Sequence, residues 1–155
     1  MAIEIERKFL LKSEAWREGA VPTPIRQGYI FANDIKSVRV RTLGDLGFIT
    51  VKSRRANSGT NEFEYEIPLE DARELLEVAC EQPIIEKTRY ARTDAGHDWS
   101  IDVFKGANSG LVLAEVELGA ADESVALPDW VGEEVTGDPR YLNANLYKQP
   151  YHSWQ

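Results

Sequence analysis

Charged side chains follow one face of almost every extended segment that the sequence predicts. Apolar and charged residues alternate with period two, as in Ile3-Glu4-Ile5-Glu6. Successive side chains of a β-strand point to opposite faces, so this alternation indicates strands whose two faces meet different environments. We expect eight strands, at residues 2–9, 27–32, 37–43, 47–54, 61–67, 84–92, 98–105 and 111–119.

Short gaps rich in turn-forming residues separate these strands, so most neighbours should be antiparallel. One amphipathic helix is expected between the fifth and sixth strands, where apolar residues recur at helical spacing. A second helix should begin at Asp138-Pro139, a capping residue followed by a proline suited to the first turn, and end near Tyr147. Residues 13–24 and 120–137 show no clear pattern. The apolar positions of the first helix are Ala72, Leu75, Leu76 and Ala79.

The bulk composition is that of one globular protein. The 155 residues are 43% hydrophobic and 28% charged, which suits a single compact domain over residues 1–155. Cys80 is the one cysteine and cannot form an internal disulfide, so we expect a reducing, cytoplasmic location. No segment has the apolar length of a membrane span. The net charge of −8 argues against nucleic-acid or membrane partners unless a basic site is local.

The charges are grouped by sign within each strand. Arg39 and Arg41 share one strand face, whereas Glu115 and Glu117 share another. Strand faces in contact with water usually mix charges of both signs with neutral polar residues. Like charges side by side repel one another unless an ion of opposite sign neutralises them. The pattern therefore predicts ligands: phosphate groups for the cations and metal ions for the carboxylates.

The charged faces have two possible positions. They could meet bulk water as half-exposed strands, or the sheet could close with the charges inside and the helices on its apolar outer face. An eight-stranded barrel has room inside for about one small ligand. Burying unpaired ions costs several kcal/mol each, more in total than a typical stability of ~5–15 kcal/mol, so such a lumen must be wet and partly neutralised. We expect this lumen to contain the cations Lys8, Arg39, Arg41, Lys52, Lys87 and Arg89, and the carboxylates Glu4, Glu6, Glu62, Glu64, Asp102, Glu115 and Glu117.

These residues resemble the signature of the CYTH domain, or triphosphate tunnel metalloenzyme, superfamily. Glu4-x-Glu6-x-Lys8 matches the ExExK motif of the family, and the match extends in order over essentially the whole chain. One departure is visible, because relatives often carry an arginine shortly before the fifth-strand Glu-x-Glu, where this chain has Thr60 and Asn61. The other matching positions are Arg39-x-Arg41, Lys52, Glu62-x-Glu64, Lys87-x-Arg89, Asp102, Glu115-x-Glu117 and a C-terminal Tyr141-x-Asn143.

The resemblance implies an α+β, mainly antiparallel fold: a closed eight-stranded β-barrel, or triphosphate tunnel, with flanking helices. The six cations above would bind triphosphate, with Lys8 and Lys52 also neutralising charge that develops during the reaction. Either Glu62 or Glu64 could hold the attacking water. Divalent metal, magnesium or manganese, would be held by Glu4, Glu6, Asp102, Glu115 and Glu117.

The function expected first is an inorganic tripolyphosphatase that releases orthophosphate and pyrophosphate, because the short chain has no obvious insertion for an organic group. A class IV adenylate cyclase, a thiamine triphosphatase and a non-catalytic polyphosphate or nucleotide-binding module are the alternatives. A lipocalin-like carrier would require an apolar lumen, and no GxxxxGK loop is present. His97, His152 and Cys80 are not expected to be catalytic. The expected partner is a small triphosphate, and the expected assembly is a monomer or homodimer.

Overall fold

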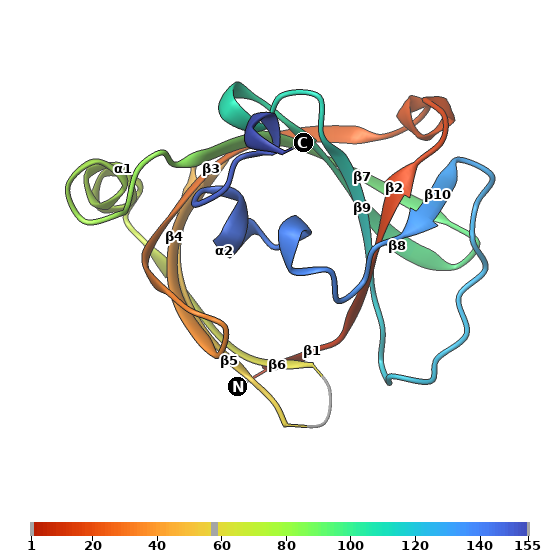
Figure 1. The fold of residues 1–155 in the computed structure, drawn as a ribbon, viewed down its shortest axis with the longest axis horizontal. Helices are drawn as coiled ribbons and strands as arrows, with labels where there is room; N and C mark the ends of the chain where they lie inside the picture. The colour runs from red at the N-terminus through yellow and green to blue at the C-terminus, as the bar shows by residue number, and fades with distance from the viewer. Residues whose placement is uncertain (1, 57–58, 155) are drawn as a thin grey trace.

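The strands form one antiparallel sheet that curls into a ring (Figure 1). The computed structural model describes residues 2–56 and 59–154, with side chains from residue 5 onward. The strands are β1 (Ala2–Glu4), β2 (Glu6–Leu11), β3 (Val21–Ala32), β4 (Lys36–Leu43), β5 (Leu46–Arg54), β6 (Thr60–Ile67), β7 (Ile85–Asp94), β8 (His97–Phe104), β9 (Val112–Glu117) and β10 (Val131–Glu134). The helices are η1 (Ala15–Arg17), α1 (Leu69–Val78), η2 (Gly106–Asn108), η3 (Pro139–Tyr141), α2 (Asn143–Leu146) and η4 (Tyr151–Ser153).

The neighbour order within the sheet is β1-β6-β5-β4-β3-β7-β8-β9-β2-β10. This order confirms the mainly antiparallel fold, and each of the eight expected strands has a counterpart. The first expected strand is divided into β1 and β2 at Ile5. The second is much longer than expected, since β3 already begins at Val21. No element was predicted for residues 120–137, but they contribute β10. This strand pairs with the C-terminal half of β2, at Phe9 and Leu11.

The ring is completed by the N-terminal segment. β1 pairs with β6, whereas β2 pairs with β9, so one continuous stretch of chain joins the two ends of the sheet. The ladder of backbone hydrogen bonds is interrupted at Ile5, where the segment changes partners. The expected barrel is therefore present in outline, but it is not closed by an unbroken ladder.

The strand register confirms which residues share a face. Arg39 is the Cα partner of Thr50, and Thr50 is the partner of Glu64, so these three side chains lie in a row across β4, β5 and β6. Lys8 and Glu115 are partners in the same way on β2 and β9. Residues directly opposite each other in antiparallel strands project from the same face of the sheet. The charged positions of neighbouring strands therefore converge on the inside of the ring.

Apolar residues fill the outer face, as the alternation predicts. The helix α1 covers β4 and β5, where Ala72 and Leu76 pack with Val40. The approach is close, because a Cβ added to Gly47 would lie 2.8 Å from the Cβ of Ala72. The outer face of β2, β8 and β9 is covered by the short helix η1 and by the segment that leads into β10, in a cluster that includes Trp16, Trp99 and Trp130.

The C-terminal segment departs from the prediction. A helix from Asp138-Pro139 to Tyr147 was expected, and Asp138 does cap the backbone N–H of Arg140. However, Leu142 has an extended backbone (φ −74°, ψ 132°), which separates η3 from the short helix α2. This segment does not flank the barrel on its outer face.

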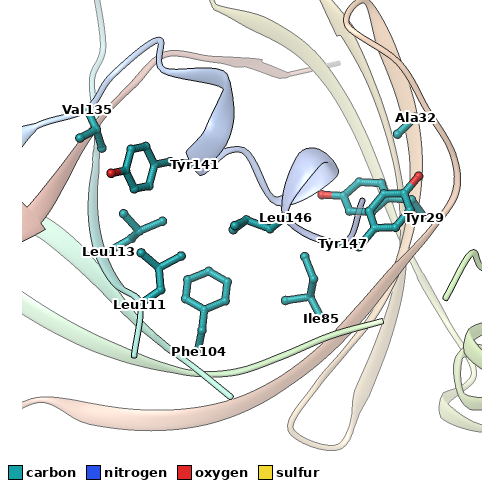
Figure 2. Packing of buried hydrophobic residues seen from close by; sticks show 10 residues of the cluster. All are labelled: Tyr29, Ala32, Ile85, Phe104, Leu111, Leu113, Val135, Tyr141, Leu146 and Tyr147. Atoms are coloured by element: carbon teal, nitrogen blue, oxygen red, sulfur yellow. The ribbon is translucent and has the colours of Figure 1, made fainter. Parts of the chain in front are cut away.

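Instead, the C-terminal segment lies within the ring in Figure 1. Figure 2 shows its side chains Tyr141, Leu146 and Tyr147 packed against inward-facing residues such as Ile85 and Leu113. Leu146 is completely buried. One part of the interior is thus an apolar core, and only the remainder is available to the charged side chains. None of the helices that the structure describes has the length and apolarity required to cross a bilayer.

Candidate functional site

The remaining interior is a cavity of about 760 Å³ with charges of both signs on its wall. Each barrel strand from β2 to β9 contributes at least one side chain to the lining. Cations gather on β4, β5 and β7, and carboxylates on β6 and β9. The residues predicted from sequence that line it are Glu6, Lys8, Arg39, Arg41, Lys52, Glu62, Glu64, Lys87, Arg89, Glu115 and Glu117.

A buried ion cluster forms one side of the cavity. Asp102 on β8 accepts two hydrogen bonds from Arg89, from Nε at 2.8 Å and from the terminal nitrogen NH2 at 2.9 Å. Lys87 Nζ lies 2.8 Å from the second oxygen of the same carboxylate. Lys87 also donates to Asn143 Oδ1 at 3.1 Å. The carboxylate therefore holds both cations of the Lys-x-Arg pair, and the C-terminal segment contacts one of them.

Burial and charge act in opposite directions on this cluster. Burial lowers the pKa of Lys87 to about 8, although the nearby Asp102 opposes the shift. Burial would raise the pKa of Asp102, but Lys87 and Arg89 outweigh it and hold that pKa below the ordinary value. Asp102 is thus an ionised carboxylate whose oxygens are already engaged by two cations.

The arginine pair on β4 shares a single carboxylate. The terminal NH2 nitrogens of Arg39 and Arg41 lie 3.4 and 3.2 Å from Glu64 Oε2. Thr50 Oγ1 donates to the same oxygen at 2.8 Å. All of these contacts converge on Oε2, and among the described residues Oε1 of Glu64 has no such partner.

The arginines retain unused hydrogen-bonding capacity. The Nε atoms of Arg39 and Arg41 are both buried and have no partner among the described residues. Burial, together with the neighbouring charge of Arg39, lowers the pKa of Arg41 to about 10. One glutamate does not neutralise two guanidinium groups, so this wall is suited to an additional anion with several oxygen atoms.

The acidic wall combines β2 and β9. Glu6 and Glu117 are Cα partners, and so are Lys8 and Glu115. Lys8 Nζ lies 3.5 Å from Glu115 Oε1 and donates to the carbonyl oxygen of Tyr141 at 3.1 Å. Burial would raise the pKa of Glu115, but Lys8 and Arg89 outweigh it and a hydrogen bond with Glu6 adds to the lowering, so the pKa lies well below its ordinary value.

The metal ligands predicted from the sequence stay a prediction. No group of three or more Asp, Glu, His or Cys within that set lies close enough to hold a metal ion. Glu4 was also predicted as a ligand, but its side chain lies outside the described part of the chain. Glu6 and Glu115 nevertheless place two carboxyl groups within hydrogen-bonding reach of each other. Closely spaced oxygen ligands of this kind fit a hard divalent cation.

Several further residues line the cavity that the sequence did not single out. Ser37 and Ser100 lie two residues before Arg39 and Asp102 on the same strand faces, so the period of two could have found them. Asn143 also lines the cavity and was already named from the sequence, in the Tyr141-x-Asn143 match. Tyr29 and His97 carried no comparable signal. Asp102 itself is placed behind Lys87 and Arg89 instead of at the lining.

Comparison with known proteins agrees with this architecture. The family model described as "CYTH domain" matches residues 2–151. An inorganic triphosphatase of Acetivibrio thermocellus is 48% identical over 155 residues, covering 100% of this chain and 99% of the relative. An inorganic triphosphatase of Nitrosomonas europaea is 40% identical over 149 residues, covering 92% and 95%.

A solved structure described as an inorganic triphosphatase is also similar. It shares 37% sequence identity with this chain, covers 95% of each chain and superposes with a TM-score of 0.65. The family model matches nearly the whole sequence, and both relatives are more than 30% identical to it. These findings lead to the same assignment. The chain belongs to the CYTH domain family.

Proposed function

We propose that this protein is a metal-dependent phosphohydrolase that cleaves inorganic tripolyphosphate to orthophosphate and pyrophosphate. The observation that carries the proposal is the cavity wall, which combines cations on β2, β4, β5 and β7 with carboxylates on β2, β6 and β9. The two curated relatives described above are both named inorganic triphosphatase, which supports the same chemistry. The single tunnel domain would extend over residues 1–155.

The cations would bind the phosphate oxygens. The terminal nitrogens of Arg39 and Arg41 lie 3.4 and 3.2 Å from Glu64 Oε2, and Lys52 Nζ lies 3.5 Å from Glu62. Guanidinium groups form charge-assisted hydrogen bonds with phosphate oxygens, often in pairs. On substrate binding the arginines would exchange part of their contact with Glu64 for contact with phosphate. Lys8, Lys52, Lys87 and Arg89 would complete the basic wall and neutralise charge that develops on the leaving pyrophosphate.

The lining favours an inorganic substrate over one with a ring. Tyr29 is the only Phe, Tyr or Trp among the described lining residues. One side of its ring is already stacked on Tyr147, with centroids 5.4 Å apart and planes 16° apart. Leu142, Asn143 and Ala144 line the cavity from the C-terminal segment and reduce the space beyond it. A nucleobase or thiazolium ring therefore has little apolar surface on which to stack.

Glu64 is the better placed of the two proposed water-binding carboxylates. Its Oε2 accepts a hydrogen bond from Thr50, which would remain when the arginines turn to phosphate, so the group would stay held beside the basic wall. Its Oε1 is left to accept a hydrogen bond from a water molecule. Glu64 would orient that water toward an end phosphate and take up its proton as the new P–O bond forms. The bond to the leaving pyrophosphate breaks, and its charge is neutralised by the lysines.

A divalent cation would be held on the acidic wall. Glu6, Glu115 and Glu117 present carboxylate oxygens to the cavity, and Glu4 precedes Glu6 by two positions in the sequence. Magnesium or manganese, when bound there, would neutralise phosphate charge and polarise the phosphoryl group. Asp102 is less suited to direct coordination, because Arg89 and Lys87 engage both of its oxygens.

The proposal is tested by incubating the purified protein with tripolyphosphate, ATP or thiamine triphosphate, each with magnesium or manganese, and identifying products by phosphorus NMR. Fast release of orthophosphate and pyrophosphate from tripolyphosphate is expected, with slow turnover of the two organic compounds. Cyclic AMP and pyrophosphate from ATP, with tripolyphosphate unchanged, would establish a cyclase instead. Binding without products under both metals would indicate a non-catalytic module.

Two further proposals concern the cellular location and the assembly of the protein. Cys80 is a buried free thiol, which is compatible with the cytoplasmic location that we propose. A small triphosphate is the proposed partner, with no role for nucleic acid or membrane. We propose a monomer or homodimer, to be distinguished by light scattering.

A further inference from the structure

Gln27 is a buried amide on the inner face of the barrel that the proposed reaction does not use. Its side chain is completely buried on β3. Neither its Nε2 nor its Oε1 has a hydrogen-bond partner among the described residues. A buried polar group without a partner destabilises a protein, and an apolar residue of similar size would avoid that cost. We therefore expect the Gln27 amide to have a hydrogen-bond partner in the folded protein.

The neighbours of Gln27 differ sharply on its two sides. Its Cα partner on β4 is Arg41, and its Cα partner on β7 is Ile85. Ile85 belongs to the cluster of Figure 2 and has no polar side-chain atom to offer. Arg41 carries a buried Nε–H that also lacks a partner within the described chain. An unused acceptor thus lies directly across the ladder from an unused donor.

The spacing allows these two groups to meet. Side chains directly opposite each other in antiparallel strands have Cβ atoms about 4.5–5.5 Å apart. The structure shows no direct hydrogen bond between Gln27 Oε1 and Arg41 Nε. Both side chains are long, so one buried water can bridge the two atoms. Gln27 is not among the described residues that line the cavity, so it lies beside Arg41 on the inner face without bordering the substrate space.

We propose that Gln27 is a positioning residue for Arg41: Arg41 Nε donates to one buried water, and that water donates to Gln27 Oε1. With Nε engaged by the wall, the guanidinium presents its two terminal nitrogens to the cavity. Those nitrogens are the pair that can grip two oxygens of one phosphate group. This inference rests on the proposed function, in which Arg41 binds triphosphate.

The arrangement also explains how Arg41 remains oriented when its other partner changes. In the structure Arg41 contacts Glu64 through a terminal nitrogen at 3.2 Å. Phosphate oxygens would compete for that nitrogen, but not for Nε. A fixed contact at Nε therefore holds the guanidinium plane in one orientation. The terminal nitrogens can then leave the Glu64 carboxylate and bind phosphate without the group turning.

The decisive experiment is a double-mutant cycle with Gln27→Met and Arg41→Lys. Methionine has a similar volume and no amide, and lysine retains the charge but has no Nε–H. In the parent protein, Gln27→Met is expected to raise the KM for tripolyphosphate about tenfold, which corresponds to about 1.4 kcal/mol. The kcat should change by less than about twofold. In the Arg41→Lys background the same replacement should alter KM by less than about twofold.

The matched control is Ile85→Val, which changes packing beside Gln27 without removing a polar group. It should leave KM at the parent value. An equal rise in KM from Gln27→Met in both backgrounds, or no rise in the parent, would overturn the proposal. A similar rise from Ile85→Val would reduce Gln27 to a packing role and overturn it too.

A second measurement does not depend on activity. The Nε–H proton of Arg41 can be identified by NMR as the arginine signal lost in Arg41→Lys. Its hydrogen exchange should be slow in the parent and clearly faster in Gln27→Met, whereas Ile85→Val should not change it. This result would stand even if the protein neither bound nor cleaved tripolyphosphate, in which case only the proposed function would fail. Unchanged exchange in Gln27→Met would refute the contact itself. Should Gln27→Met not fold, Gln27→Asn provides the same comparison with a shortened amide.

Discussion

Arg89 and Asp102 face each other across β7 and β8 as Cα partners and are joined by two hydrogen bonds of 2.8 and 2.9 Å. Lys87 adds a third contact to the same carboxylate at 2.8 Å. One carboxylate thus stabilises two cations that the reaction is proposed to use. It keeps both of them charged and in place when no phosphate is present.

Replacing Asp102 by asparagine should therefore destabilise the protein. Lys87 is fully buried, and removing one member of a buried ion pair typically costs about 3–5 kcal/mol. We expect a markedly lower melting temperature, measured by calorimetry. Tripolyphosphate supplies negative charge to the same cations, so it should raise the melting temperature of D102N by more than it raises that of the parent.

Asp98→Asn is the matched control for this prediction. Asp98 lies on the same strand, is exposed and accepts a hydrogen bond from Thr93 at 2.8 Å. An exposed replacement of this kind should change stability by about 0.5 kcal/mol or less. Equal melting temperatures for D98N and D102N would show that Asp102 has no special structural role.

A second prediction concerns Arg39. Arg39→Ala should raise the KM for tripolyphosphate about tenfold or more, because charge-assisted hydrogen bonds to phosphate are lost. The fold should be retained, since the charge of Arg39 contributes to the lowered pKa of Arg41 and its removal relieves that repulsion. Kinetics and thermal unfolding, measured together, separate the two effects.

Arg26→Ala provides the comparison for Arg39→Ala. Arg26 is exposed on β3, on the opposite face from Gln27, and lies 3.9 Å from Glu86. It should leave both KM and the melting temperature close to the parent values. If R39A kept parental kinetics as well, the charged row on β4 would have no part in substrate binding.

The residues of the inner wall were predictable from the sequence, because the alternation that reveals them can be read within each strand alone. A period of two assigns every residue of a strand to one of two faces, and the grouped charges of Arg39 and Arg41 or Glu62 and Glu64 identify the face that needs a ligand. The register then brings these strands together as expected. The start of β3 was missed because Pro22 and Pro24 interrupt a strand pattern, although in this region β3 pairs only with β7 and so has one unpaired side.

The interior position of the C-terminal segment was not predictable in the same way. Its apolar residues Leu146 and Tyr147 have a spacing equally consistent with a helix on the outer surface. Their burial depends on long-range contacts, including Lys8 with the carbonyl of Tyr141 and Lys87 with Asn143. The partial filling of the tunnel therefore arises from tertiary structure, not from local pattern. Gln27 was overlooked for the related reason that a single neutral amide in a strand carries no charge signal.

A third prediction concerns the outer core. Burial raises the pKa of the Cys80 thiol to about 11, compared with an ordinary value near 9. A difference of about two units leaves about 100-fold less thiolate at pH 8, and the thiolate is the reactive form. Cys80 should therefore resist alkylation by iodoacetamide in the native protein and react readily in denaturant. Rapid labelling of the native protein, followed by mass spectrometry, would show that the cover of α1 opens easily.

A fourth prediction concerns the metal. Chelation should abolish hydrolysis, and magnesium or manganese should restore it, because the carboxylates of β2 and β9 need a countercharge once triphosphate enters. Glu117→Gln should raise the metal concentration needed for half-maximal activity, since Glu117 lines the cavity opposite its Cα partner Glu6. Glu133→Gln, on β10 and exposed, is the control. Undiminished activity in excess chelator would contradict a metal-dependent reaction.

The last prediction distinguishes the two carboxylates of β6. Glu64 is held through Oε2 by Thr50, Arg39 and Arg41, and its Oε1 is available to a water molecule. In Glu64→Gln the side chain keeps its shape, but it can no longer accept a proton from that water. The kcat for tripolyphosphate should fall by about 100-fold or more, within the range of general-base catalysis, while KM changes little.

Glu62 lies beside Lys52 at 3.5 Å, two residues along the same strand face. Glu62→Gln should lower kcat by a much smaller factor, so it serves as the matched control for Glu64→Gln. Steady-state kinetics with orthophosphate release as the readout would measure both. A larger loss of kcat in E62Q than in E64Q would assign the attacking water to Glu62, and equal parental rates in both would remove the β6 carboxylates from the mechanism.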